Sequence, residues 1–353
     1  MRDSELLPRL PHQAKILFIR LRSLGDTILS TPLYAALKAW RPDLRIAVLI
    51  ERPNDEVLWH NPNIDEIICL GRDLRARWSA LAAVRQMHFD CCINLHGGCS
   101  SAWVTALSRA RHRIGDSKFR NSFAYNLRID SDTTQSQKKK AHTVEHQIGW
   151  LRALGLPKAE IPPLGVYLDP GSETAAKDHL KKAGVGPGAG LAVIHPTSRF
   201  YTKEWTAEGF AEIADYLAGR YGLSVLLTGG PGEGEKLADI HAKSRTKPVV
   251  LTSLSVPELA WILSRARVFV GNDSGPTHLA TALSIPVVVL FGSSDSGVWY
   301  PWKAPYRIVQ NPFDCNPCPG YRCLVYDEPR CILSITTSQV KTAIDILLGG
   351  NTA

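Results

Sequence analysis

Short apolar runs alternate with helical patterns along the first half of the chain. The apolar runs lie at residues 16–21, 45–50, 64–70 and 91–95, and residues 31–39 and 76–86 carry apolar positions at helical spacing. Such alternation is typical of a parallel sheet covered by helices on both faces. We therefore expect an α/β domain in this part of the chain.

The alternation restarts after a polar passage around residues 156–170. Further apolar runs lie at residues 190–195, 223–228, 249–251, 268–271 and 286–291, and residues 338–348 form a last helical pattern. The length of the chain also favours two domains over one. The sequence therefore predicts two α/β sheets in series, in domains at residues 1–170 and 171–335, with a C-terminal helix within residues 336–353.

The composition is that of an ordinary soluble protein. Of the 353 residues, 44% are hydrophobic and 21% are charged, which is enough to bury a large core. Residues 1–14 carry charges and two prolines and lack the apolar centre of a secretory signal. No stretch approaches the roughly 18 apolar residues of a membrane-spanning helix. We expect the protein in the cytoplasm, where it can still touch a membrane surface.

The formal net charge of +8 is concentrated in one segment. Residues 109–140 contain nine Lys or Arg against three Asp. A basic segment of this kind favours an anionic partner such as nucleic acid, acidic lipid or an acidic sugar, and the alternative is a solvated loop. Because the chain lacks zinc-finger and RNA-recognition signatures, nucleic acid is not the expected partner.

Two separated segments each place a polar turn with a glycine between an apolar strand and a helix. One runs from Val270 to His278, with Asp273 and Ser274 in its turn, and the other runs from residue 15 to residue 32 and presents Asp26. Unpaired backbone N–H groups and the positive end of a helix dipole meet at such a turn, where a phosphate can bind. The alternative for either turn is a plain helix N-cap.

Two common nucleotide-binding patterns are not matched. Only Gly25 follows the first strand, whereas a dinucleotide-binding fingerprint has three glycines. In the glycine-rich stretch at residues 228–236, the lysine comes one place late for a triphosphate-binding loop, and Leu237 replaces the required Ser or Thr. Neither a dinucleotide enzyme nor a triphosphate hydrolase is therefore expected.

Together with His195-Pro196-Thr197-Ser198 and the following Lys203 and Trp205, these segments resemble glycosyltransferase family 9, the ADP-heptose:lipopolysaccharide heptosyltransferases. The resemblance spans residues 15–348, and its three motifs occur in the family's order. It implies an α/β protein of GT-B fold, with two Rossmann-like parallel-sheet domains facing across a cleft. It also implies that the last helix crosses back onto the first domain.

The resemblance further implies roles for individual side chains. Asp26 matches the family's catalytic aspartate, a general base for the acceptor hydroxyl. Glu233, with Glu235 in reserve, matches an acidic residue near the ribose. The expected contacts to the nucleotide sugar are Thr197, Ser198, Lys203, Glu233, Asp273, Ser274, Gly275 and His278. Because these groups can neutralise a diphosphate without a metal, no cofactor is expected.

On this resemblance, the expected activity is inverting transfer of heptose from ADP-L-glycero-D-manno-heptose to the inner core of lipopolysaccharide. The second domain would hold the donor, and the first would hold the acceptor through Arg111, Arg113, Lys118 and Arg120. The expected state is a monomer peripheral to the inner membrane. Two alternatives stay open: a related transferase with another sugar or a protein acceptor, and a non-catalytic protein that binds nucleotide sugars or acidic glycans.

Three patterns could indicate a metal. Cys315, Cys318, Cys323 and Cys331 have a spacing that a zinc or iron–sulfur site could use, although the second pair lacks the tight spacing of a zinc ribbon. The resemblance favours a structural role for these four cysteines. Residues 142–146 match an inverted zinc-peptidase motif, and Asp130 and Asp132 match the Asp-x-Asp of metal-dependent transferases, but both patterns are weak alone.

Overall fold

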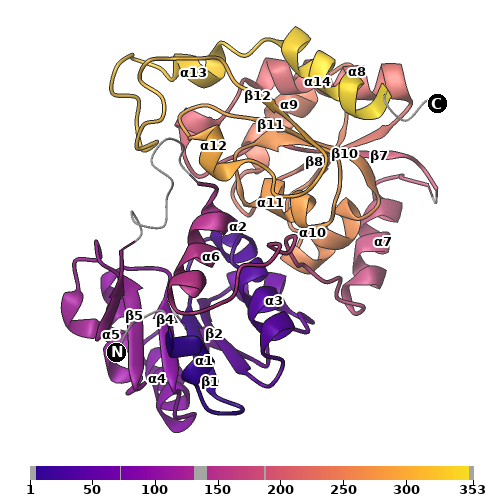
Figure 1. Ribbon diagram of the computed structural model, residues 1–353. Coiled ribbons are helices and arrows are strands. Elements are labelled where there is room, and N and C mark those ends of the chain that lie inside the picture. Colours follow the sequence, from indigo (N-terminus) through magenta and orange to yellow (C-terminus); the bar gives the residue numbers. More distant parts are fainter. Residues whose placement is uncertain (1–4, 72, 131–140, 187, 350–353) are drawn as a thin grey trace. The chain divides into compact units, whose positions relative to one another are not determined.

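The computed structural model describes residues 5–71, 73–130, 141–186 and 188–349 (Figure 1). The chain divides into two compact units, Met1–Tyr167 and Leu168–Ala353, close to the expected boundary after residue 170. Asp132 of the Asp-x-Asp pattern and the three lysines at 138–140 lie outside the described residues.

The first unit is built on a six-stranded parallel sheet with the order β3-β2-β1-β4-β5-β6. Its strands are β1 (Lys15–Ile19), β2 (Arg45–Glu51), β3 (Glu66–Leu70), β4 (Cys91–Asn94), β5 (His112–Asp116) and β6 (Leu127–Ile129). Its helices are α1 (Leu6–Arg9), α2 (Leu24–Ile28), α3 (Thr31–Trp40), α4 (Leu74–Gln86), α5 (Cys99–Leu107) and α6 (Thr143–Ala153).

Helices cover both faces of this sheet. Helix α3 packs against α6, and α4 packs against α5 on the other side (Figure 1). Between α4 and the sheet lies an apolar cluster that includes Leu17, Leu49, Val84 and Cys92, all fully buried. Because both faces of the central strands are covered, these strands are the continuous apolar runs of the sequence.

The second unit repeats the architecture with the sheet order β12-β11-β10-β7-β8-β9, again all parallel. Its strands are β7 (Leu191–His195), β8 (Ser224–Thr228), β9 (Val249–Leu251), β10 (Ala266–Asn272), β11 (Val287–Leu290) and β12 (Tyr306–Val309). Its helices are α7 (Ser172–Lys182), α8 (Ala207–Tyr221), α9 (Gly234–Lys243), α10 (Val256–Leu263), α11 (Gly275–Ala282), α12 (Ser296–Trp299), α13 (Arg330–Leu333) and α14 (Thr337–Gly349).

Local sequence explains where several helices begin and end. The side chains of Asp73, Thr206 and Ser255 cap α4, α8 and α10 by accepting a hydrogen bond from a backbone N–H of the first turn. Gly222 ends α8 in the left-handed conformation, with φ of 64°, which a residue without a Cβ adopts at little cost.

The last helix departs from the expectation. Helix α14 does not return to the first domain but packs on β12 and α8 of the second unit. Its apolar face, with Val340, Ile344 and Leu348, is part of the core of that unit. On its polar side, Asp345 accepts hydrogen bonds from two tyrosine hydroxyls of α8. The expected crossing is therefore wrong, because the side chains that would have to leave are buried where they are.

Both units have the strand order of a Rossmann fold, as expected from the sequence. In the part of the chain that the structure describes, no helix is both long and apolar enough to cross a membrane.

Candidate active site

Each sheet has one point where the direction of strand addition reverses, between β1 and β4 in the first unit and between β7 and β10 in the second. In open parallel sheets, ligands bind beyond the carboxyl ends of the strands at this switch point. Asp26 follows β1, whereas Thr197 and Lys203 follow β7, and Asp273 follows β10. The residues predicted from the sequence thus come to the two switch points.

At the end of β7, a chain of hydrogen bonds links neighbouring strands. The Thr197 hydroxyl donates to Glu233 Oε2 at 2.7 Å and lies 3.1 Å from His195 Nε2, while His195 Nδ1 lies 3.3 Å from the Thr228 hydroxyl. Glu233 Oε2 also accepts from the backbone N–H of Gly230 at 2.5 Å. Two donors therefore fix the orientation of the Glu233 carboxylate. A carboxylate that binds a ligand hydroxyl needs such a fixed orientation.

His195 is neutral in this network. Burial lowers its pKa to about 4, against the opposing effect of the Glu233 carboxylate. The Thr197 hydroxyl lies between the two groups, 3.1 Å from His195 Nε2 and 2.7 Å from Glu233 Oε2. The imidazole therefore orients the Thr197 hydroxyl without adding charge to the site.

Lys203 and Asp273 form an ion pair across the same switch point. Lys203 Nζ donates to Asp273 Oδ2 at 2.7 Å, and the two side chains are 21% and 6% exposed. Lys203 lies in a short turn of 3-10 helix, Tyr201–Lys203, and the chain next to it is held by Ser198, whose backbone N–H donates to Glu204 Oε1 at 3.0 Å. The lysine is thus oriented by a carboxylate rather than loose on a solvated loop.

The amino end of α11 completes this region. Ser274 is its N-cap residue, Gly275 begins the helix, and His278 is buried one turn later. Ser274 Oγ is buried and finds no hydrogen-bond partner among the described residues. The first backbone N–H groups of a helix are also unpaired within it. This helix end therefore has donors available for an anion.

The close approach of two strands depends on Gly271, the last residue but one of β10. It lies opposite His195 in the parallel ladder, and a Cβ built on it would lie 2.8 Å from the His195 carbonyl oxygen. Any larger residue would push β7 and β10 apart. The glycine thus keeps Thr197 and Asp273 on neighbouring strands at close range.

In the first unit, Asp26 takes part in a capping box. Ser23 is the N-cap of α2, and Asp26 Oδ2 accepts from the Ser23 backbone N–H at 3.3 Å and from its hydroxyl at 3.0 Å. The capping alternative raised from the sequence is thus part of the answer, with Asp26 at the third helical position rather than at the cap. The side chain remains half-buried, so capping and catalysis are compatible.

A group of charged side chains that the sequence reasoning missed surrounds this aspartate. Burial lowers the pKa of His96, which follows β4, and Arg20 and Arg22 lower it further, while Asp26 and Glu51 act in the opposite direction. All four charges are therefore close enough to act on the His96 ring. Arg22 is paired with Glu51 at 3.4 Å, whereas Arg20 is nearly fully buried.

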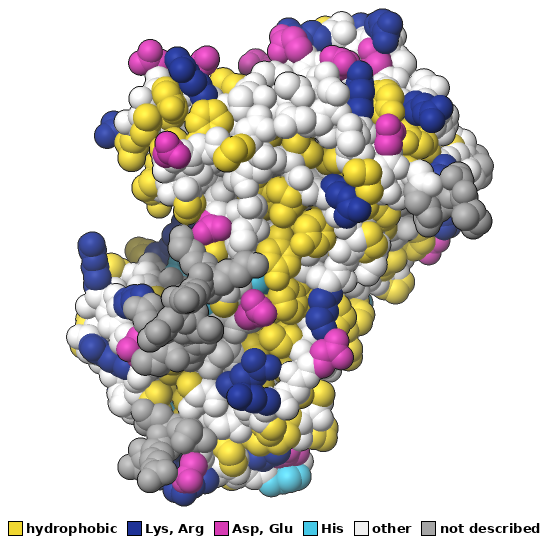
Figure 2. Space-filling model, turned by 45° about the horizontal axis from the view of Figure 1, so that its top comes forward, with side chains coloured by type: hydrophobic (Ala, Val, Ile, Leu, Met, Phe, Trp, Pro, Cys, Tyr) yellow, Lys and Arg dark blue, Asp and Glu magenta, His cyan; other side chains and the backbone are white. Residues whose placement is uncertain are grey.

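The four basic residues expected to hold the acceptor lie in two places. Arg111 and Arg113 are at the amino end of β5, and Arg113 donates to the Ala110 and Ala124 carbonyl oxygens. At about 3.3 Å per residue, Arg111 lies about 16 Å from the carboxyl end of the strand. Lys118 and Arg120 follow that carboxyl end and are exposed. On the face drawn in Figure 2, Lys and Arg side chains are dispersed rather than gathered in one patch.

The metal candidates stand in different surroundings in the described residues. His142 caps α6 in a capping box with Glu145. The cysteines at 315, 318, 323 and 331 line one cavity of about 120 Å³, and burial raises the pKa of Cys331. Within the described part of the chain, no three His, Cys, Asp or Glu side chains are arranged to hold a metal ion.

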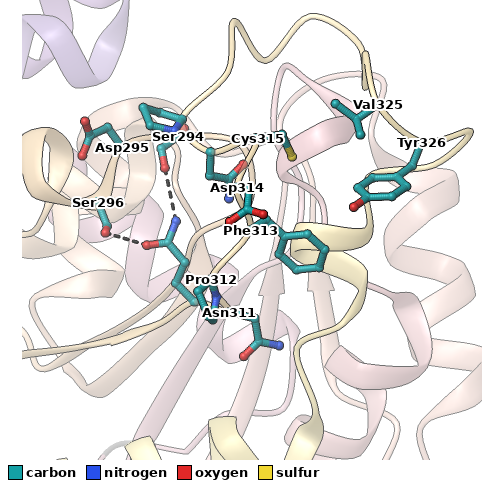
Figure 3. Close-up of a pocket in the computed structure, with 13 residues that line it drawn as sticks. Ser294, Asp295, Ser296, Asn311, Pro312, Phe313, Asp314, Cys315, Val325 and Tyr326 are labelled. Carbon is teal, nitrogen blue, oxygen red and sulfur yellow. Dashed lines mark hydrogen bonds between the residues drawn. The ribbon is translucent and has the colours of Figure 1, made fainter.

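A larger cavity of about 1020 Å³ lies beside the site, beyond the carboxyl ends of β11 and β12 (Figure 3). Gln310 ties its two sides together, since it accepts from the Ser296 hydroxyl at 2.6 Å and donates to the Ser294 carbonyl oxygen at 3.2 Å. Phe313 and Tyr326 add aromatic surface. Sequence reasoning missed this cavity because its walls are irregular loops, without the strand–turn–helix signal that marks the other sites.

Comparison with known proteins agrees with this geometry. The chain is similar to the structure of a glycosyl transferase family 9 protein from Veillonella parvula, with a TM-score of 0.83, 24% identity and coverage of 99% of this chain and 100% of that one. It is also similar to the E. coli ADP-heptose lipopolysaccharide heptosyltransferase II structure, with a TM-score of 0.79, 21% identity and coverage of 96% and 100%. These likenesses and the two Rossmann-like units show that the chain has a GT-B fold.

The family follows from the sequence comparisons. The model of glycosyltransferase family 9 (heptosyltransferase) matches residues 77–327. Lipopolysaccharide heptosyltransferase 3 of Escherichia coli is 29% identical over 291 residues, which cover 79% of this chain and 84% of that protein. The chain belongs to glycosyltransferase family 9, and it is an enzyme of the heptosyltransferase type.

Proposed function

We propose that this enzyme transfers heptose from ADP-L-glycero-D-manno-heptose to the inner core of lipopolysaccharide, with inversion at the anomeric carbon. The observation that carries the proposal is the switch point of the second unit, where Lys203, Asp273 and the amino end of α11 form a site for an anion. Its relatives include lipopolysaccharide heptosyltransferase 3 and ADP-heptose lipopolysaccharide heptosyltransferase II of E. coli, which supports the choice of substrates.

In this proposal the second unit binds the donor. The Lys203 ammonium, the Ser274 hydroxyl and the backbone N–H groups at Gly275 and beyond stabilise the diphosphate, and they do so more strongly as its charge grows on departure. His278 lies one turn into the same helix and contributes to this contact. Thr197, Ser198 and Glu233 hold the nucleoside side, where the Glu233 carboxylate accepts from ribose hydroxyls.

Asp26 is the proposed general base in the first unit. It takes the proton of the acceptor hydroxyl as the oxygen forms a bond to the anomeric carbon, while the bond from that carbon to the diphosphate oxygen breaks and ADP leaves. Attack from the face opposite the leaving group inverts the configuration. The backbone and hydroxyl donors of Ser23 hold the Asp26 carboxylate in one orientation.

A matched pair of variants tests this role. Asp26→Asn keeps a capping oxygen and should cut turnover by about 10²–10⁴, with ADP binding unchanged. Asp73→Asn, in the N-cap of α4, changes a carboxylate of the same unit in the same way and should keep full turnover. The assay follows ADP release from ADP-heptose with a panel of truncated lipopolysaccharides. Near wild-type turnover in Asp26→Asn contradicts the assignment, and ADP release only with a protein acceptor contradicts the choice of substrate.

We also propose that the enzyme works as a monomer on the cytoplasmic surface of the inner membrane. The outer sides of α4 and α5 support a membrane contact, because Trp78 on α4 is 68% exposed and Trp103 on α5 is 59% exposed. Phe123 packs beside Trp103 with ring centroids 5.0 Å apart, and Arg75 and Arg77 are exposed on α4. Aromatic side chains next to arginines are suited to an anionic bilayer surface.

Vesicle binding tests the membrane contact. The double variant Trp78→Ala with Trp103→Ala should sediment less with vesicles that contain anionic lipid, and it should keep turnover on a soluble acceptor fragment. Equal sedimentation of the variant and the wild-type enzyme contradicts the role of this face.

A further inference from the structure

Arg20 is a buried cation without a counter-ion. It directly follows β1, and only 9% of its surface is exposed. No carboxylate within the described residues forms an ion pair with it, and its Nε atom is buried without a hydrogen-bond partner. An arginine taken out of water is normally paired, because the loss of hydration is large. The Nε atom of Arg20 is therefore a donor that an anion can satisfy.

The position of Arg20 suits a ligand. It lies at the switch point of the first unit, directly after β1, and His96 follows the neighbouring strand β4. Arg22 is paired with Glu51, and Asp26 accepts from Ser23, so among the described residues neither carboxylate forms a direct ion pair with Arg20. A guanidinium offers a planar pair of donors that matches the two oxygens of a carboxylate or phosphate.

We propose that Arg20 binds a carboxylate or phosphate group of the acceptor and thereby positions the acceptor hydroxyl at Asp26. The inference rests on the proposed function. The proposed donor site has Lys203 and the α11 end in the second unit, whereas Arg20 is in the same unit as Asp26, and both charges act on the His96 ring. His96 adds a ring donor to the same anion without a second full charge.

The first test measures thermal stability and needs no sugar substrate. In buffer without phosphate or sulfate, Arg20→Met should melt at a higher temperature than the wild-type protein, because it removes the unpaired charge and keeps a linear side chain. Arg41→Met is the contrasting control, since Arg41 is paired with Asp43 at 2.7 Å, and it should melt lower. A lower melting temperature for Arg20→Met in this buffer assigns Arg20 a purely structural role and overturns the proposal.

Inorganic phosphate at millimolar concentration is the probe for the anion site. It should raise the melting temperature of a Lys203→Met protein, in which the donor site is weakened, and fail to raise that of the Lys203→Met, Arg20→Met double variant. An equal rise in both proteins places the phosphate elsewhere and contradicts the proposal. This result is independent of heptose transfer, so it can stand when the proposed function fails.

Kinetics then separate the two sources of anion. Arg20→Met should raise the acceptor KM at least tenfold, with the donor KM and ADP binding unchanged, and Arg20→Lys should lie between. Two modified acceptors identify the anionic group, one with its carboxyl groups reduced and one with its phosphates removed. For the acceptor that lacks the group bound by Arg20, the wild-type enzyme and Arg20→Met should have the same KM. A rise in donor KM alone means that the anion belongs to the donor and overturns the acceptor assignment.

Discussion

The buried histidine at the end of β7 makes a quantitative prediction about acid stability. His195 has a pKa of about 4 in the folded protein, because burial disfavours the charged ring, whereas an unfolded histidine titrates at about 6.5. Between these values the unfolded state binds a proton that the folded state does not. Stability should therefore fall as the pH falls from about 6.5 to about 4, and this contribution should level off below that range.

The size of the effect follows from the same two values. The linkage relation gives about 2 kcal/mol of lost stability between about pH 7.5 and pH 5.0, and about 3 kcal/mol below pH 4. His195→Gln removes the titrating ring and should lose this pH dependence. Its stability at neutral pH should also drop, because the variant disturbs the hydrogen bonds to Thr197 and Thr228.

Two measurements check this reasoning. NMR of the protein labelled at histidine Cε1 should show one ring that remains neutral at pH 5 and disappears in His195→Gln. Urea unfolding at pH 7.5 and 5.0 should show a smaller loss in His195→Gln than in the wild-type protein. The control His241→Gln removes a half-buried histidine of the same unit and should keep the wild-type loss. An identical loss in His195→Gln would refute the assignment.

The remaining predictions concern the substrates. Lys203→Met should weaken ADP binding about tenfold or more, which corresponds to about 1.4 kcal/mol. Asp273→Asn should also weaken ADP binding, because the lysine loses its orientation. Calorimetry measures both affinities, and unchanged binding in both variants excludes this site. Lys118→Ala with Arg120→Ala should raise the acceptor KM in a salt-sensitive manner, whereas Arg111→Ala should not; equal effects would show that the segment acts as a whole. Activity should survive EDTA, and a loss restored by manganese would overturn the metal-free diphosphate site.

The apolar runs predicted the middle strands of each sheet and also the edge strands β3 and β9. The middle strands are covered on both faces, so the runs around Leu17, Leu49 and Val270 are continuously apolar. Strands β5, β6 and β12 were not predicted, since they lie at or near sheet edges and carry partly exposed polar residues such as Arg113 and Arg307. Unlike the edge strands β3 and β9, these three strands have no continuous apolar run to reveal them.

The part of the site that could not be predicted from the sequence is the pairing of residues that are distant along the chain. The turn residues could be found because a strand, a glycine and a helix follow each other in sequence, but the pairing of Lys203 with Asp273 joins two such turns. Arg20 was read as one position of an apolar strand, residues 16–21, although β1 ends at Ile19. A charged residue inside an apolar run, just before a glycine turn, is the signal that could have revealed it.

The place of α14 has a consequence for how the enzyme can be taken apart. Because this helix stays with the second unit, each unit is one uninterrupted stretch of polypeptide, divided between Tyr167 and Leu168. A gene divided at that point encodes two units that each contain all of their own helices. If α14 belonged to the first unit, the same division would leave that unit without it. The second unit can then be expressed alone, and first units of related enzymes can be joined to it as exchangeable modules.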